Sequence, residues 1–367
     1  MFLPPSECEH ILKRTARPPI SFDSPTAFMN SLWARFLSLW TSSFAYSLIG
    51  GQLLSVCLTC TSVITAELVD HNWALPCTQI FFTYLSLFVV YTPYTVHRYG
   101  FQGWRKVLLH DGWRYFLLAI CDVEGNFLAV TAYQYTDILS CMLLDAWAIP
   151  VSLFLCWLYM KTRYHWTQIF GIIVSICGLA LLVLSDFVTG KDGHAEDRAK
   201  GDTLIIAAAT CFGIVNATEE FLVRRSPIYE VVGQVAMWGL FLSGMQAAVL
   251  EKNLIPLQSW NVSTTNLLIG YTASTFALYS LAPLLFRTAS ASYFNISMLT
   301  SDFYGLLFGL FLFHYSPYWL YFPAFGVVIS GLFIYFWDAT PEEQGESKVQ
   351  IPAYVSAQYM GEGDLEG

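Results

Sequence analysis

Charged residues are scarce in this sequence. They make up 12% of its 367 residues, whereas hydrophobic residues make up 55%. An ordinary soluble domain carries roughly 25% charged residues, and a soluble protein this apolar could not cover its own core. The scarcity therefore excludes a soluble globular protein. The net charge of −9, without any basic stripe, gives no support to a nucleic-acid partner.

The sequence also lacks the motifs of common soluble chemistry. It contains no P-loop, no other Gly-rich phosphate loop and no nucleophile motif, so ATP-driven transport and hydrolase chemistry have no support. Its histidines do not have the spacing of metal ligands. The pair Cys57-x-x-Cys60 has redox spacing, but it lies within an apolar run with no further ligand nearby, which favours helix packing. We expect no catalytic residue, no metal and no cofactor.

What the sequence does contain is a series of apolar stretches of membrane-spanning length. A hydrocarbon layer about 30 Å thick needs about 20 apolar residues per helix, and aromatic residues cluster at many ends of these stretches, as interfacial anchors do. The sequence predicts an all-α integral membrane protein with ten transmembrane helices, at 44–66, 75–96, 114–133, 138–160, 166–186, 203–222, 231–250, 265–286, 291–314 and 317–337.

The placement of Lys and Arg supports this span count. With a cytosolic N-terminus, all but four of the 18 Lys and Arg residues fall on the cytosolic side, as the positive-inside rule expects. Both termini are therefore expected in the cytosol, and the sequon at Asn261 falls on the opposite side, with its glycosylation left open. No cleavable signal peptide is expected, because the first 40 residues carry basic residues and prolines. Plasma membrane and Golgi or other endomembrane stay open as locations.

The two halves of the chain resemble each other. The run from Phe170 to Ser175 in the fifth predicted span matches the run from Phe325 to Ser330 in the tenth, and Ser140-x4-Asp145 matches Ser297-x4-Asp302 in the spans before them. Five is an odd number of spans, so the second repeat inserts upside down, as in many secondary transporters. The predicted organisation is a cytosolic tail at 1–43, a first five-helix repeat at 44–186, a non-cytosolic linker at 187–202, a second repeat at 203–337 and an acidic cytosolic tail at 338–367.

Polar residues in the third predicted span are the first candidates for a site. Asp122, Asn126 and Tyr133 are spaced i, i+4 and i+11 and share one helix face, which indicates either a cavity wall or a buried hydrogen-bonded cluster. Glu124 points about 200° away from Asp122 at 100° per residue, so its role is more open. Gln134 beside Tyr133 completes this candidate set.

Asp145 and Asp302 occupy equivalent places in the two repeats, each near the middle of its span. A carboxylate at that depth is costly and needs a reason to stay. A pseudo-two-fold axis would place both around one cavity; the alternatives are a carboxylate that caps a neighbouring helix and one that is held protonated.

Glu219 and Glu220 close the sixth predicted span, before Arg224 and Arg225. Salt bridges at i+4 on a cytosolic rim are the favoured interpretation. A polar stripe that runs from Asn216 toward the cavity stays open, and it keeps Asn216 and Glu220 among the candidate substrate-binding residues.

Several of these runs resemble one known family. They are Tyr115 to Asn126, Ala132 to Thr136, Leu144-Asp145 with Pro150, Glu219 to Arg224, and Leu299 to Asp302. Over roughly residues 45–337 the chain is similar to the F-type members of solute carrier family 35, in the drug/metabolite transporter superfamily. The resemblance implies the drug/metabolite transporter fold, with two inverted five-helix repeats, and it implies alternating-access transport. One departure is Thr131, where the family often has Lys.

Deep Lys and Arg are absent from the predicted spans, so the interior is acidic and aromatic and suits neutral or cationic aromatic solutes. We expect a secondary active or facilitative transporter of a small organic solute, nucleobase-like, nucleoside-like or cationic aromatic, in a lipid bilayer. Its cavity would lie between the third, fourth, sixth, eighth and ninth spans. A nucleotide-sugar antiporter is one alternative, and a membrane scaffold or sensor that acts through its acidic C-terminal tail is another. A coupling proton or a counter-substrate stays open as a partner, and so does the oligomeric state.

Overall fold

The computed structural model describes residues 24, 26–31, 33, 42–136, 138–160, 166–188, 195–258, 260–288, 291–311, 319 and 321–335. Its regular elements in these ranges are helices. They are α3 (Ser42–Asp70), α4 (Pro76–His110), α5 (Gly112–Ala132), α6 (Ile138–Asp145), α7 (Ala148–Met160), α8 (Trp166–Val188), α9 (Ala195–Val223), α10 (Ile228–Leu250), the 3-10 helix η1 (Ile255–Leu257), α11 (Val262–Thr288), α12 (Ala291–Phe311) and α13 (Tyr321–Tyr335). The predicted C-terminal tail 338–367 and most of the N-terminal tail 1–43 lie outside the described residues.

Five of the described helices are long and apolar enough to cross a membrane. They include 26 residues of α3, 27 of α11 and all 21 of α5, and at 1.5 Å per residue each exceeds the roughly 30 Å of a hydrocarbon layer. Large apolar side chains such as Tyr46, Phe154 and Phe241 are more than half exposed on the outer faces. Such exposure is expected of helices that face lipid, and the chain is a multi-pass membrane protein.

Two predicted spans differ from straight helices. The span predicted at 138–160 is broken at Ala146 and Trp147 into α6 and α7. Pro150, near the start of α7, lacks a backbone N–H and disfavours a continuous helix through the break. Helix α4 runs past the predicted end at residue 96 and breaks at Gly100, whose φ of 70° is in the left-handed region. Helix α9 begins at Ala195, inside the predicted linker 187–202.

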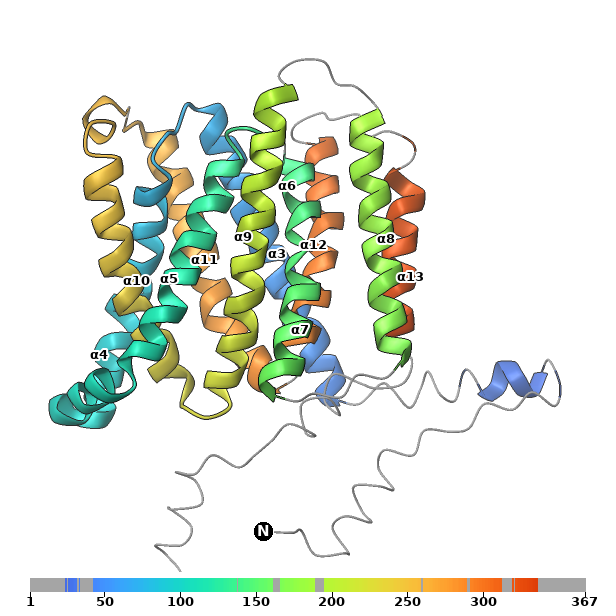
Figure 1. Cartoon of the computed structure of the whole chain (residues 1–367), viewed down its shortest axis with the longest axis horizontal. Helices are drawn as coiled ribbons and strands as arrows, with labels where there is room; N and C mark the ends of the chain where they lie inside the picture. The colour runs from blue at the N-terminus through green and yellow to red at the C-terminus, as the bar shows by residue number, and fades with distance from the viewer. Residues whose placement is uncertain are drawn as a thin grey trace, which may run out of the picture.

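Two helix pairs flank the bundle. Helices α4 and α10 pack along each other at one side, and α8 and α13 at the other (Figure 1). Both contacts depend on glycine. A Cβ added at Gly239 would overlap the ring of Tyr84, and one at Gly171 would come within 2.7 Å of the Gly331 carbonyl oxygen. Small residues let helix backbones approach closely where no hydrophobic force drives them together.

The centre of the bundle is built from α3, α5, α6, α7, α9, α11 and α12. Helix α3 packs between α11 and α12, and α9 packs between α5 and α7. Hydroxyl groups link α3 to α12, because Ser55 Oγ donates to the Ser297 carbonyl at 2.7 Å and Thr59 Oγ1 to that of Ser301 at 3.2 Å. These central helices surround the site described next.

Candidate functional site

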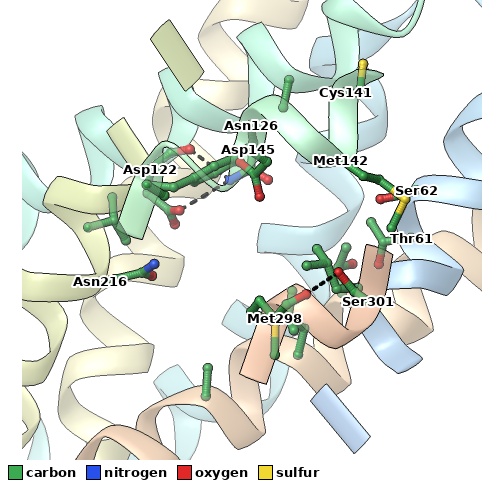
Figure 2. Close-up of a pocket in the computed structure, with 18 of the residues that line it drawn as sticks. Thr61, Ser62, Asp122, Asn126, Cys141, Met142, Asp145, Asn216, Met298 and Ser301 are labelled. Carbon is green, nitrogen blue, oxygen red and sulfur yellow. Dashed lines mark hydrogen bonds between the residues drawn. The ribbon is translucent and has the colours of Figure 1, made fainter. Parts of the chain in front are cut away.

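A cavity of about 170 Å³ lies between the central helices. Its walls come from α3, α5, α6, α7, α9, α11 and α12, whereas α4, α8, α10 and α13 contribute none of its described lining. Figure 2 shows the polar groups around the central space; those labelled are Thr61, Ser62, Asp122, Asn126, Asp145, Asn216 and Ser301. A central, mostly apolar space with a few convergent polar groups is typical of a small-molecule site.

Asp122 lies in a closed hydrogen-bond network on one side of the cavity. Its Oδ2 accepts from Tyr84 Oη at 2.9 Å, and its Oδ1 accepts from Tyr279 Oη at 2.7 Å and from Asn126 Nδ2 at 3.2 Å. The Asn126 amide also donates to Tyr279 Oη at 2.7 Å. The carboxylate is 2% exposed. The network joins α4, α5 and α11, so this carboxylate has partners from three helices.

Asp145, unlike Asp122, has a carboxylate oxygen without a hydrogen-bond partner among the described residues. It ends α6 at the break before α7, and its Oδ1 is buried without a hydrogen-bond partner among the described residues. A buried acceptor without a donor costs about 1–3 kcal/mol, so proteins rarely leave one without a reason. The side chain lines the cavity together with Asn126 and Tyr133, so this carboxylate is available to a molecule that enters.

The adjacent residues Glu219 and Glu220 have side chains in different surroundings. Glu219 lines the cavity and is 9% exposed. Glu220 is fully buried outside it, where its Oε1 pairs with Arg224 Nη2 at 3.0 Å. Adjacent residues of a helix point about 100° apart, and Arg224, four residues after Glu220, pairs with Glu220. The salt bridge predicted at i+4 is present for Glu220, whereas the stripe toward the cavity runs from Asn216 to Glu219.

Two other predicted site residues, Glu124 and Gln134, lie away from the described cavity lining. Glu124 accepts a hydrogen bond from Gln246 Nε2 of α10 and is not part of the described cavity lining, because its direction on α5 is opposite to that of Asp122. Gln134 is exposed beyond the end of α5. Asp302 lies on α12, but its side chain is outside the described part of the chain.

Residues that the sequence patterns did not indicate complete the walls. Aromatic rings come from α9, α11 and α12, and hydroxyl groups from α3 and α11; they are Phe212, Tyr271, Tyr279, Phe286, Phe294, Thr61, Ser62, Thr65 and Thr275. Hydroxyls in apolar helices carry no charge and often bond their own helix, as Thr61 and Thr65 do here. Only the contact with the cavity distinguishes them from ordinary packing residues.

The described lining of the cavity contains three carboxylates and no Lys, Arg or His. Groups of three or more His, Cys, Asp or Glu side chains that could hold a metal ion are absent from the described residues. The cavity therefore offers negative charge, hydroxyl and amide groups and aromatic faces. This combination can hold a cation or a hydrogen-bond donor, and its electrostatics oppose an anion.

Comparison with known proteins agrees with this architecture. Residues 40–337 match the model of the family described as SLC35F, solute carrier family 35. Solute carrier family 35 member C320.08 of Schizosaccharomyces pombe is 42% identical over 294 residues, which span 80% of this chain and 58% of the relative's length. Solute carrier family 35 member F2 of Mus musculus is 34% identical, over 78% of this chain and 76% of the relative.

A third relative and a solved structure add to these matches. Solute carrier family 35 member F2 of Xenopus tropicalis is 33% identical, over 82% of this chain and 79% of the relative. A crystal structure with a TM-score of 0.58 and 16% identity covers 81% of this chain and 97% of its own, which shows a shared fold. The family model covers most of the chain and the relatives exceed 30% identity, which confirms the resemblance seen in the sequence. This chain belongs to the SLC35F family of solute carrier family 35, whose members are solute transporters.

Proposed function

We infer that this protein carries a small organic solute with a positive charge or several hydrogen-bond donors through the central cavity by alternating access. The observation that carries the proposal is the partnerless buried carboxylate oxygen of Asp145 in the cavity wall. A solute donor or cation would supply the missing partner there. Glu219 and Asp122, whose oxygens already accept hydrogen bonds, add negative potential to the same cavity.

Aromatic faces narrow the class of solute. Tyr133, Tyr271, Tyr279, Phe212 and Phe286 line the cavity with aromatic rings. Cation–π contact is strongest where water is excluded. A flat nucleobase-like or nucleoside-like solute or a cationic aromatic one fits these walls. A nucleotide sugar would place its phosphates among carboxylates, with no cation in the described lining to balance them.

The packing supports a plan of ten spans in two inverted repeats, with α6 and α7 together as one span. If the first five spans are paired in order with the last five, α3 corresponds to α9, α5 to α11, and α6 with α7 to α12. The contact of α5 with α9 then has its equivalent in that of α11 with α3, and the contact of α7 with α9 in that of α12 with α3. The flanking pairs α4–α10 and α8–α13 are each their own equivalents. Such symmetry is expected of a pseudo-two-fold axis through the cavity.

An even number of spans would put both termini on the same side of the membrane, and the basic loops support the cytosolic side. A proton or a second solute occupies Asp145 while the cavity, empty of the carried solute, returns.

The test is counterflow in proteoliposomes with the purified full chain. The panel holds nucleobase-like and nucleoside-like solutes, organic cations and nucleotide sugars, each with the wild type and with Asp145→Asn. The proposal expects uptake of a neutral or cationic solute and at least a tenfold loss in Asp145→Asn, because the charge is removed while the size of the side chain is kept.

Asp70→Asn is the matched control, because Asp70 is an exposed carboxylate at the end of α3. It should transport like the wild type. Nucleotide-sugar exchange that is indifferent to Asp145→Asn would contradict the proposal and move the protein to the sugar-carrier branch of solute carrier family 35.

A further inference from the structure

A short helix leaves the bundle where α4 breaks. Gly100 has φ 70° and ψ 161°, so α4 is two helices, and the second covers residues 101–110, named the surface helix below. A side chain other than Gly would be strained at this φ, although no atom lies within 4 Å of the added Cβ. Figure 1 shows the end of α4 at the edge of the bundle rather than within it.

The surface helix is held in place at both flanks by one buried carboxylate. Tyr99 Oη donates to Glu230 Oε2 at 2.6 Å, and Tyr115 Oη donates to Glu230 Oε1 at 2.7 Å. Glu230 lies in the first turn of α10 and is 7% exposed. Burial and this carboxylate raise the pKa of Tyr99, so its hydroxyl stays a donor at neutral pH. The surface helix therefore has a fixed position on the bundle.

The outward face of the surface helix combines apolar and basic side chains. Residues 101, 105 and 109 form one stripe at i+4 spacing, with Phe101 66% and Leu109 73% exposed on either side of Arg105. Gln102, Lys106 and His110 form the next stripe, also exposed. Gly103, Trp104, Val107 and Leu108 lie on the half-buried side. Among the described residues, no ion pair involves Arg105 or Lys106.

The residues next to the surface helix add to this surface. Arg98 precedes Gly100, and Trp113 and Arg114 follow the surface helix; all three are exposed. The Arg114 guanidinium lies 5.6 Å from the centre of the Trp113 ring and 3.3 Å from the Asp111 carboxylate. Exposed tryptophan and arginine together are typical of the level of lipid headgroups.

We propose that the surface helix lies in the membrane interface and binds anionic phospholipid headgroups of the cytosolic leaflet. Phe101 and Leu109 enter the boundary of the acyl chains, while Arg105 and Lys106 meet the phosphate and carboxylate groups. Helices that lie in the interface place apolar side chains at the acyl boundary and Lys or Arg among the headgroups, and here both kinds share the outward face. Anionic lipids of the cytosolic leaflet attract basic residues next to a span. The proposal does not depend on which solute the cavity carries.

The test is native mass spectrometry of the full chain in mixed micelles with phosphatidylserine or phosphatidylcholine. The ratio of the two dissociation constants gives the preference for the anionic lipid. Arg105→Gln/Lys106→Gln should reduce this preference by about fivefold for each basic residue removed. Phe101→Gln/Leu109→Gln should weaken binding of both lipids alike, because it removes only apolar contact.

Lys200→Gln/Lys252→Gln is the matched control, with the same loss of charge at exposed positions on the predicted opposite side. It should keep the preference of the wild type. An unchanged preference in Arg105→Gln/Lys106→Gln would overturn the proposal, and so would an equal loss in the control. The four basic side chains substituted here are exposed, and none of them takes part in a described salt bridge. The preference of the wild type for the anionic lipid should also fall as the salt concentration is raised.

Discussion

Asp122 and Asp145 are two aspartates of one cavity in opposite states. Asp122 accepts hydrogen bonds from Tyr84, Tyr279 and Asn126, which hold it from three helices. Asp145 lies at a helix break, and its Oδ1 has no partner among the described residues. The same chemical group is thus part of the framework at one position and an open acceptor at the other.

The difference separates stability from binding. Removal of the Asp122 carboxylate leaves the hydroxyls of Tyr84, which is fully buried, and Tyr279 without their acceptor, which is a cost to the folded state. Removal of a carboxylate without a partner takes away an existing penalty and costs the folded state little. Depth in the membrane alone makes both residues candidates for a site, and only their hydrogen-bond partners tell the two roles apart.

The largest effect on folding is expected from Asp122→Ala. It leaves the Tyr84 and Tyr279 hydroxyls without their acceptor, and we expect the free energy of unfolding to fall by about 3 kcal/mol. Asp145→Ala should change it by less than about 1 kcal/mol. Titration of the purified protein with denaturing detergent measures both, and equal losses would erase the distinction between the two aspartates.

Gly239→Ala should disturb the hydrogen bonds of Asp122 through Tyr84. The new methyl group would overlap the Tyr84 ring and push its hydroxyl away from Asp122, at a cost of about 2 kcal/mol. With Tyr84→Ala in the background the ring is gone, and the same substitution should then cost less than half as much. Strictly additive costs in this double-mutant cycle would show that Gly239 does not act through Tyr84.

Tyr279→Phe should have a smaller effect. It removes one donor to Asp122 and one acceptor for Asn126 but keeps the ring in the cavity wall. A hydrogen bond to a charged group contributes about 1.5 kcal/mol or more, so we expect a loss near that value in the detergent titration. Tyr159→Phe, at an exposed tyrosine near the end of α7, should stay at the wild-type value. A loss as large as that of Asp122→Ala would mean that the other donors contribute nothing.

The smallest effect is expected from Glu124→Gln. Glu124 bonds to Gln246 on α10 rather than facing the cavity, and a glutamine keeps an oxygen that can accept the same bond. The free energy of unfolding should change by about 0.5 kcal/mol or less, and counterflow transport should be retained. Loss of transport with normal stability would return Glu124 to the candidate site.

Helix ends and one helix face could be predicted from the sequence. Apolar length predicted α5 and α8 to within two residues at each end, because a helix needs about 20 mostly apolar residues to cross the hydrocarbon layer. The spacing of Asp122, Asn126 and Tyr133 placed them together on one face, and the structure has all three in the cavity wall. Helical periodicity is a local property, so the sequence alone is sufficient for it.

Contacts between distant helices could not be predicted in the same way. Glu219 and Glu220 have the same chemistry, and only the packing of α9 decides that the first faces the cavity and the second Arg224. Tyr84 and Tyr279 carry no periodic signal that links them to Asp122. The break between α6 and α7 lies just before Pro150, and from sequence this proline is as compatible with a kink in one helix as with a gap between two.

The most direct test of the central claim is solute-induced stabilisation of the purified protein, with the solute that counterflow identifies. At about 100 times its dissociation constant, a bound solute should raise the free energy of unfolding of the wild type by about 2.7 kcal/mol. If Asp145 is the open acceptor, Asp145→Asn should unfold like the wild type without solute. Its gain at the same solute concentration should be only about 1.4 kcal/mol or less, as a tenfold weaker affinity gives. Equal stabilisation of the two proteins would contradict the account.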